Sequence, residues 1–424
     1  MFHRFRSLSA AAPGLPAIIE ANSGRTVSRG ELLARAEELA GDIRPGDLVP
    51  IQLPNSAEFV ALFLAVLKQR AIAMLIDRDA SDAEVAGIRS HFGPRPALPP
   101  EARVIKLTSG STGKPKGIVT SDANLLADCT SICATMDIRA DDVNFGTIPL
   151  SHSYGFSNLV TPLITQGTAV VISNDYLPQT IIDWCNRYRC TVLPGIPMMF
   201  DHLAAMPRSA GTFESVRTFI SAGAPLQPST SRRFRERFGA PIHSFYGCSE
   251  CGGITYDREG AAAERGTVGA PMDGVEISLR RSRVIVNSNA VALGYLQENF
   301  EPLVRGEFVT EDLAELRDAE VVLTGRASDL INTAGKKVNP REIEQVILEI
   351  DGVRQVKVYG EPAGARGEVV AAAVVADPEV TREVVRAFCR ERLSLHKVPR
   401  IVKLIERIPV DERGKITRSA LAEL

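Results

Sequence analysis

Residues 108–117 read TSGSTGKPKG and follow directly on the apolar run Val104 to Leu107. The stretch combines hydroxyl residues, glycines and two lysines within ten positions. Glycines let the backbone turn its N–H groups into one concavity, hydroxyls add hydrogen-bond donors, and lysines supply positive charge. A loop of this composition is suited to binding the oxygens of a polyphosphate.

The loop differs from a Walker A loop, which carries Ser or Thr directly after Gly-Lys so that a hydroxyl can bind magnesium. Here Pro115 follows Gly113 and Lys114. Proline has no N–H and disfavours a helical conformation in the residue before it, so we do not expect the loop to lead into a phosphate-capping helix. The loop is therefore predicted to bind nucleotide by another arrangement. The alternative is a solvated turn rich in Gly, Ser and Lys.

All ten residues resemble, without a mismatch, the phosphate loop of the adenylate-forming superfamily, which includes acyl- and aryl-CoA ligases, peptide-synthetase adenylation domains and luciferases. The resemblance covers most of the chain from Val104 to the end, and its motifs follow in family order. It implies that ATP is bound through seven residues of the loop: Thr108, Ser109, Gly110, Ser111, Thr112, Gly113 and Lys116.

Size and composition are those of a soluble enzyme with two or three domains, because 424 residues exceed one small core. The net charge of −2 argues against a nucleic-acid or anionic membrane partner. Seven cysteines scattered over a long chain favour reduced thiols and a cytoplasmic location. Cys248 and Cys251 form a CxxC pair, but without a second pair we do not expect a metal or redox site there. The N-terminus lacks an apolar core of signal-peptide length, so we expect neither export nor membrane insertion.

Hydrophobic periodicity predicts an α/β fold in which helices alternate with short strands. We expect a large AMP-binding domain of sheets flanked by helices at residues 1–328, closed by a small β unit, and a small mobile α+β domain at 329–424.

Ser28 and Glu31 form a capping box that opens one helix. Residues 77–100 are polar and proline-rich, which suggests that a βαβ portion before residue 104 is missing relative to the family. Further helices are expected at 56–69, 121–136 and 153–165, and a strand at 144–150.

Two segments resemble the parts of the family that contact adenine, the α-phosphate and magnesium. In Phe245-Tyr-Gly-Cys-Ser-Glu250, the resemblance implies that Tyr246 stacks on adenine and that Gly247 leaves room for the acyl chain. Ser249 would contact the α-phosphate and Glu250 would bind Mg²⁺, a hard cation suited to a carboxylate. Gly223 and Ala224 belong to a loop that resembles the one between adenine and the acyl pocket. The alternative for Glu250 is a satisfied carboxylate at a strand end.

The ribose site and the reacting centre are also implied by resemblance. Asp312 matches the aspartate that accepts from the ribose diol, although Glu311 replaces the usual glycine before it. Arg326 resembles the arginine that contacts the ribose-phosphate. Lys415 lies where the family places the lysine that bridges the carboxylate and the α-phosphate, and a mobile point charge suits that transition state. Taken alone, Lys415 would be a solvated charge.

Residues 335–344 resemble the loop and helix that enter the active site for the thiol-transfer step. Asp329 resembles the hinge residue of the family. We therefore hypothesise that the small domain rotates about Asp329 between the two half-reactions.

The candidates to contact the acyl group lie in less specific sequence patterns than the nucleotide-binding motifs. His152 resembles a gating histidine of acyl- and aryl-CoA ligases, and a histidine of the core is the alternative. Phe156, Met198 and Met199, with Gly252 and Gly253, are candidates to line an apolar tunnel. The segment around His152 has no acidic residue to pair with an α-amine, which disfavours an amino-acid substrate.

These observations predict an ATP- and Mg²⁺-dependent enzyme that activates an aryl or acyl carboxylic acid and transfers it to a thiol, most simply CoA. Two alternatives stay open: loading of the phosphopantetheine of a separate acyl carrier protein, and a non-catalytic nucleotide-binding homologue. Retention of Glu250, Asp312 and Lys415 together argues against the last. The oligomeric state is open, with a homodimer as one option.

Overall fold

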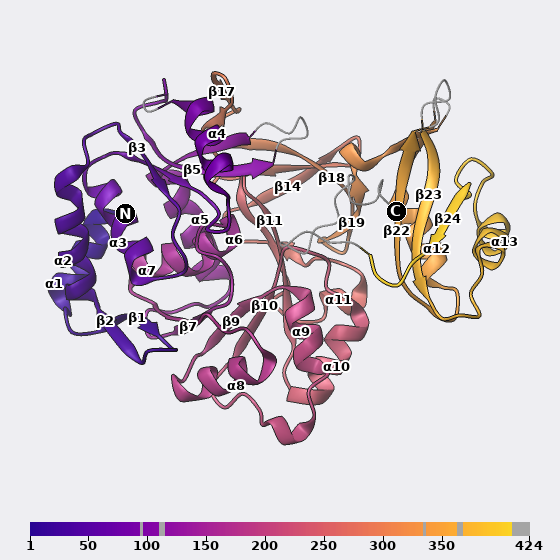
Figure 1. Cartoon of the computed structure of the whole chain (residues 1–424), viewed down its shortest axis with the longest axis horizontal. Helices are drawn as coiled ribbons and strands as arrows, with labels where there is room; N and C mark the ends of the chain where they lie inside the picture. The colour runs from indigo at the N-terminus through magenta and orange to yellow at the C-terminus, as the bar shows by residue number, and fades with distance from the viewer. Residues whose placement is uncertain (94–95, 110–114, 334–335, 363–367, 409–424) are drawn as a thin grey trace. The chain divides into compact units, whose positions relative to one another are not determined.

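The computed structural model describes residues 1–93, 96–109, 115–333, 336–362 and 368–408 (Figure 1). The chain divides into two compact units. The first comprises Met1–Ser278, Ile285–Val309 and Leu316–Val322, and the second comprises Leu279–Val284, Thr310–Glu315 and Leu323–Leu424. The observed elements confirm the predicted mixed α/β class. The assignment of functional domains to residues 1–328 and 329–424 stays a prediction.

A nine-stranded sheet forms the centre of the first unit. In spatial order its strands are β13 (Ala270–Pro271), β12 (Gly252–Tyr256), β11 (Ile242–Cys248), β10 (Thr218–Ser221), β9 (Val192–Gly195), β7 (Val143–Gly146), β8 (Ala169–Ile172), β1 (Pro16–Glu20) and β2 (Arg25–Ser28). The successive strands from β11 to β1 are parallel to one another, whereas β12 pairs antiparallel with β11 and β2 pairs antiparallel with β1. β8, β9 and β10 are buried along their whole length, as expected for parallel strands covered on both faces.

Aromatic residues fix one group of helices on this sheet. Helices α8 (Pro178–Arg187), α9 (Pro197–Ala204) and α10 (Pro228–Phe238) each have proline in the first turn, where its missing N–H costs nothing. The ring of Phe234 lies 5.5 Å from that of Phe200 and 5.0 Å from that of Phe219 on β10, in edge-on contacts. Short helix η3 (Arg208–Ala210) is bonded to α8 through Gln179, and short helix α11 (Ala262–Arg265) contacts α10.

The predicted capping box is confirmed at the start of a second helical group. Ser28 accepts from the Glu31 N–H, and Glu31 accepts from Ser28 in return, at the start of α2 (Arg29–Leu39). Helix α2 packs beside α1 (Phe2–Ala11) and α3 (Ala57–Lys68), in the indigo part of Figure 1. Short helix η1 (Ala40–Asp42) follows α2. Within the described residues, no helix has both the length and the apolarity needed to cross a membrane.

A six-stranded sheet carries the phosphate-loop candidate. Its order is β17 (Phe300–Pro302), β16 (Gly294–Leu296), β6 (Pro115–Ser121), β5 (Ala102–Ser109), β4 (Ile72–Leu75) and β3 (Leu48–Ile51). Strands β5 and β6 are antiparallel, and Ser109 pairs with Pro115 across the loop. The loop therefore joins two strands of a hairpin. The prediction from Pro115 that no helix starts there is confirmed.

One helix was not foreseen in the region before the loop. Residues 77–100 contain α4 (Asp82–Phe92), whose Ser81 and Glu84 form a second capping box. Val85 and Phe92 are buried, so this polar stretch still contributes to the core. The same Ser-x-x-Glu signature that identified α2 marks this helix in the sequence.

The segments after β6 follow the predicted alternation with one irregularity. Helix α5 (Asp122–Thr135) matches its prediction. Strand β7 ends at Gly146, earlier than predicted, because the loop that follows contains Pro149, which has no N–H for a sheet ladder. The helix predicted at 153–165 consists of α6 (Ser153–Gly155), the π-helical η2 (Phe156–Val160) and α7 (Thr161–Gln166). Such π-helical turns often mark functional sites.

The remaining elements start with a four-stranded sheet in the order β14 (Glu276–Arg280), β15 (Arg283–Asn287), β18 (Glu307–Arg317) and β19 (Glu320–Arg326). The other elements of the second unit are η4 (Ala327–Asp329), β20 (Ile331–Thr333), β21 (Lys336–Val338), α12 (Pro340–Leu348), β22 (Val353–Pro362), β23 (Glu368–Ala376), α13 (Arg382–Arg392) and β24 (Ile401–Leu404). The predicted start of a helix at Pro340 is confirmed, with Asn339 as its cap. Ile343, Ile347, Val374 and Val385 form part of a separate core in this unit.

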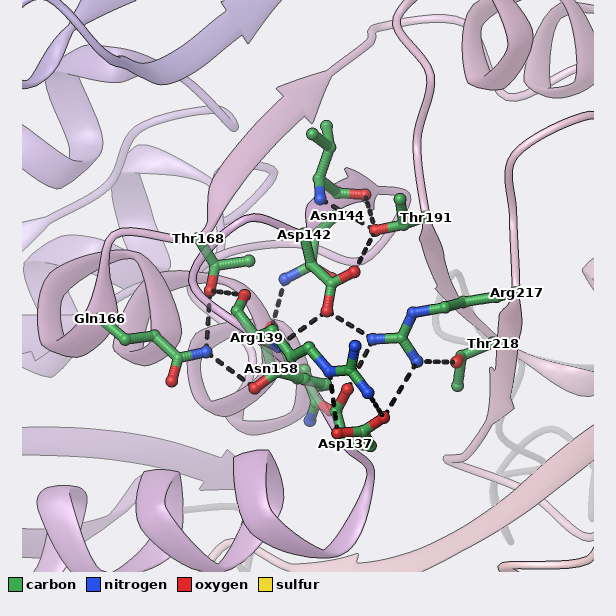
Figure 2. A network of polar contacts seen from close by, with 12 residues as sticks. Asp137, Arg139, Asp142, Asn144, Asn158, Gln166, Thr168, Thr191, Arg217 and Thr218 are labelled. Carbon is green, nitrogen blue, oxygen red and sulfur yellow. Dashed lines mark hydrogen bonds and ion pairs between the residues drawn. The ribbon is translucent and has the colours of Figure 1, made fainter.

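Polar side chains join the amino ends of the parallel strands (Figure 2). Asp142, directly before β7, accepts from Thr191 Oγ1 at 2.6 Å and from the Arg139 N–H at 2.7 Å. The guanidinium of Arg217, before β10, donates to Asp142 Oδ2 at 2.5 Å. The Asp142 side chain is only 6% exposed. This network holds three strands in register at the edge where they begin.

Replacing Asp142 with alanine is expected to lower the free energy of unfolding by roughly 1–3 kcal/mol, because it leaves the Thr191 hydroxyl and the Arg139 N–H without their buried acceptor. Urea unfolding followed by circular dichroism would measure the change. The matched control is Asp79→Ala, since the exposed Arg78–Asp79 pair lies outside the network and should contribute less than about 1 kcal/mol. Equal losses in the two variants would contradict the role given to Asp142.

Candidate active site

The carboxyl ends of the parallel strands bring several predicted residues to one edge of the nine-stranded sheet. β7 leads towards His152, β10 leads into Gly223 and Ala224, and β11 leads into Ser249 and Glu250. In open α/β sheets, ligands bind outside the carboxyl ends of the strands. The polar network of Figure 2 lies at the opposite, amino ends.

Lys116 is the cation of the phosphate loop that the structure describes. It lies on β6, paired with Thr108, and its Nζ lies 3.3 Å from the centroid of the Tyr295 ring on β16. A cation over an aromatic face is held by the ring quadrupole. Gly110, Ser111, Thr112 and Gly113 lie outside the described residues, as do the side chains of Thr108 and Ser109.

Tyr295 also contacts the candidate metal ligand. Its hydroxyl donates to Glu250 Oε1 at 3.3 Å. Burial, together with the negative charge of Glu250, raises the pKa of Tyr295, so the phenol stays protonated and acts as a donor. One tyrosine therefore links Lys116 of the phosphate loop to the carboxylate of Glu250.

Glu250 fits the role of a magnesium ligand. Its side chain is half-buried in the turn between β11 and β12, and the backbone N–H of Ala292 fixes that turn by donating to the Glu250 carbonyl at 2.8 Å. Oε2 has no partner among the described residues, which leaves a hard oxygen ligand of the kind that Mg²⁺ prefers. Over the same residues, no cluster of three or more His, Cys, Asp or Glu is grouped to hold a metal. A site here would therefore be completed by phosphate oxygens and water, as is usual for Mg²⁺.

Ser249 joins the turn to the segment that begins at His152. Ser153 Oγ donates to Ser249 Oγ at 2.7 Å. Tyr246 is half-buried and Gly247 is exposed. A Cβ at Gly247 would lie 2.5 Å from the carbonyl oxygen of Gly252, so only glycine fits there.

His152 is exposed, which rules out the alternative of a core histidine. It caps α6, where its Nδ1 accepts from the Tyr154 N–H at 3.4 Å. Of the tunnel candidates, Phe156 is fully buried and packs edge-on against Phe63 at 4.9 Å, as a core residue does. Met198 is 55% exposed.

The loop after β10 is open on one side. Gly223 has φ +87°, in the left-handed region that favours glycine, and it is exposed together with Ala224. Ser221, at the end of β10, is buried, and its Oγ has no hydrogen-bond partner among the described residues. An unpaired buried hydroxyl at a strand end is often completed by a ligand or water.

The second unit brings the two ribose candidates together. Arg326 Nε lies 3.0 Å from Asp312 Oδ1. Thr310 Oγ1 accepts from the Asp312 N–H at 3.1 Å and so fixes the backbone there. Glu311, which replaces the usual glycine, pairs with Arg283 at 3.2 Å, so it is directed to a partner of its own.

The predicted hinge residue and the cysteines lie in the structure as follows. Asp329 ends η4, and Lys415 and Gly335 lie outside the described residues. The seven cysteines are free thiols. Cys248 Sγ and Cys251 Sγ lie 3.2 Å apart, and this contact, with burial, raises the pKa of Cys248.

Three polar residues near the site were not identified from the sequence: Tyr295, Lys106 and Asp128. Tyr295 lies in a stretch without a recognisable motif. Lys106 lies two residues before the phosphate loop, and Asp128 lies within the amphipathic pattern of α5, where an acidic residue ordinarily faces solvent.

Comparison with known proteins gives consistent matches over the whole chain. The family model described as AMP-binding enzyme matches residues 5–100 and 93–290, and the model described as AMP-binding enzyme C-terminal domain matches residues 342–415. The chain is 28% identical to feruloyl-CoA synthase from Amycolatopsis sp. over 393 residues, covering 88% of this chain and 78% of that protein. It is 26% identical to oxalate–CoA ligase from Arabidopsis thaliana over 475 residues, covering 93% and 92%.

Among solved structures, O-succinylbenzoate coenzyme A synthetase from Bacillus subtilis in complex with AMP has a TM-score of 0.83 at 23% identity. The match covers 98% of this chain and 97% of that one. At this identity the likeness establishes the fold alone.

Proposed function

The chain belongs to the AMP-binding enzyme family, and on that premise we propose that it activates an aryl or acyl carboxylic acid with ATP and transfers the acyl group to CoA. It is an AMP-forming acid–thiol ligase. The identity of the acid, the choice of CoA as thiol and the roles of individual residues are parts of the proposal.

The reaction has two steps. A carboxylate oxygen attacks the α-phosphorus of ATP, the bond to the bridging oxygen of pyrophosphate breaks, and an acyl-adenylate forms. The thiol sulfur then attacks the acyl carbon, its proton passes to solvent, and AMP leaves with the electrons of the broken C–O bond. Catalysis of such chemistry depends mainly on positioning and on neutralising phosphate charge.

In the first unit, we assign phosphate binding to Lys116 and the magnesium ligand to Glu250. Tyr295 holds both, because its ring faces the Lys116 ammonium and its hydroxyl donates to Glu250. Ser249, held by Ser153, would contact the α-phosphate. A bound magnesium ion supplies charge neutralisation on the phosphate oxygens.

In the second unit, Asp312 is assigned to the ribose hydroxyls and Arg326 to the ribose-phosphate. The ion pair between them supports the assignment, since it fixes the orientation of the Asp312 carboxylate, whose oxygens are acceptors. Lys415 is assigned to the reacting carboxylate and α-phosphate on the basis of its sequence segment.

The single observation that carries the proposal is the linkage of Lys116 to Glu250 through Tyr295. A solvated turn would have no reason to hold its lysine over the ring of a tyrosine that bonds to a carboxylate following another sheet. The arrangement gives a cation for phosphate oxygens next to a carboxylate for the metal.

The test measures pyrophosphate release from ATP and Mg²⁺ across a panel of aryl and fatty acids, followed by thioester formation with CoA or with a phosphopantetheinylated carrier protein. We expect release that depends on the acid, and a thioester with CoA. If a thioester forms only with the carrier protein, the carrier protein and not CoA is the acceptor. No release with any acid would support the non-catalytic alternative and overturn the proposal.

A further inference from the structure

Lys106 is a buried ammonium that the roles assigned above do not use. It lies on β5, two residues before the phosphate loop, and is 3% exposed. Among the described residues its Nζ has neither a hydrogen bond nor an ion pair, and it lies 5.9 Å from the centroid of the Phe156 ring. A lysine on a strand usually extends its ammonium into water. A desolvated ammonium without a hydrogen-bond acceptor is costly, so its retention requires a reason.

The groups around Lys106 belong to the candidate active site. Burial lowers the pKa of Lys106, while the negative charges of Asp128 and Glu250 and the thiols of Cys248 and Cys251 act in the opposite direction. The geometry agrees, because the Lys106 ammonium lies 5.9 Å from the ring centroid of Phe156, and the same segment bonds through Ser153 to Ser249, next to Glu250.

The Asp128 carboxylate offsets the charge of Lys106, and each of its oxygens already accepts one hydrogen bond from another group while keeping a further acceptor site. Asp128 is 4% exposed; its Oδ2 accepts from Ser157 Oγ at 2.6 Å and its Oδ1 accepts from the Gly253 N–H at 2.9 Å. A Cβ at Gly252 would lie 2.2 Å from Asp128 Oδ1, so the turn approaches this carboxylate as closely as glycine permits. The ammonium hydrogens of Lys106 are left without an acceptor among these residues.

Two polar bridges join the segment at 153–157 to the segment at 249–253. Ser153 bonds to Ser249 next to Glu250, and one helical turn further along, Ser157 bonds through Asp128 to Gly253. Phe156, beside Lys106, lies between Ser153 and Ser157 and within the π-helical turn. Polar groups therefore follow both segments from Glu250 to Asp128, beside the Lys106 ammonium.

We propose that Lys106 determines substrate specificity by donating a hydrogen bond to a hydroxyl group that the acid carries at the end remote from its reacting carboxylate. The proposal rests on the function proposed above. Lys106 is not a catalytic residue in this scheme, because it contacts the remote end of the acid.

Charge balance favours a hydroxyl over a second carboxylate. The Lys106 and Asp128 charges already cancel, so a second carboxylate would leave one uncompensated negative charge in a buried site. A hydroxyl oxygen accepts from the ammonium, and its own hydrogen can be shared with Asp128 or with a thiol sulfur. A wholly apolar chain would leave the ammonium unpaired, and sites built to bond a substrate hydroxyl strongly reject analogues that lack it.

The experiment compares kcat/KM for pyrophosphate release with matched acids: 4- and 3-hydroxybenzoate against benzoate, 4-hydroxycinnamate against cinnamate, and ω-hydroxy fatty acids against the parent acids. The wild-type protein is expected to prefer the best hydroxy acid over its partner by at least about 100-fold. In Lys106→Met the ratio is expected to fall to about tenfold or less, through loss of the hydroxy acid rather than of its partner. The matched control is Arg103→Met on the same strand, a partly exposed cation bonded to backbone carbonyls, which should leave the ratio unchanged.

The outcomes separate the inference from the function on which it rests. Release with none of the acids, in wild-type protein, would overturn both. Pyrophosphate release without a preference for a hydroxy acid over its partner would overturn the inference alone, and so would a preference for a dicarboxylate. A preference for the hydroxy acid that persists in Lys106→Met would also overturn it. If Lys106→Met does not fold, as judged by circular dichroism, Lys106→Gln serves in its place and is expected to lower the ratio while keeping an N–H donor; an unchanged ratio in that variant would again overturn the inference.

Discussion

Replacing Lys415 with alanine is expected to lower the rate of acid-dependent pyrophosphate release by about 10²–10³-fold, the usual effect of removing one group that stabilises charge in a transition state. The lysine is assigned to the point where carboxylate oxygen approaches the α-phosphorus. The KM for ATP should change little, because the contact is made mainly in the transition state. Initial rates of pyrophosphate release over a range of ATP concentrations would measure both quantities.

The contrasting variant for Lys415 is Asp329→Pro, at the end of η4. If the small domain rotates about this residue, the variant should keep adenylate formation and lose thioester formation, because only the second step needs the rotated arrangement. The two half-reactions are measured separately, by pyrophosphate release and by thioester yield from preformed acyl-adenylate. An unchanged rate in Lys415→Ala would remove this lysine from the mechanism, and equal loss of both steps in Asp329→Pro would argue against rotation.

The second large effect is expected from Glu250→Gln, which keeps the shape of the side chain and removes its charge. A neutral amide is a poor ligand for a hard cation, so we expect acid-dependent pyrophosphate release to fall by roughly 10²-fold or more at millimolar Mg²⁺. Raising the Mg²⁺ concentration should restore part of the loss. A Mg²⁺ titration of the initial rate at saturating ATP would measure this.

The matched control is Glu276→Gln, an exposed glutamate on β14, which should leave the Mg²⁺ titration unchanged. A Glu250→Gln variant with the wild-type dependence on Mg²⁺ would instead make Glu250 a structural partner of Tyr295.

The parts of the fold that could be predicted from the sequence are those governed by local rules. Ser28 and Glu31 marked the start of α2, and Pro340 marked the start of α12. Pro115 excluded a helix after the phosphate loop, because its effect on the preceding residue acts within one peptide unit. Helix α4 was missed because composition was weighed above its Ser81–Glu84 capping box.

The parts of the site that escaped prediction depend on contacts between distant segments. Tyr295 on β16 reaches Glu250 across 45 positions of sequence, and no local pattern encodes that approach. Lys106 follows Val104 and Ile105 in a strand of unremarkable sequence, and it is buried beside Phe156, which lies 50 positions further along the chain. Resemblance to a family identified residues shared with relatives, but neither of these two.

The amino and carboxyl ends of the parallel strands differ in how firmly side-chain hydrogen bonds hold them. Asp142, Thr191 and Arg217 fasten the amino ends with buried bonds, whereas the carboxyl ends lead into loops such as the one with exposed Gly223 and Ala224. To change which acids the enzyme accepts, the loops at the carboxyl ends can therefore be randomised. The buried bonds at the amino ends should keep these variants folded. Libraries built in this way should retain a high proportion of properly folded members, whichever acids they come to accept.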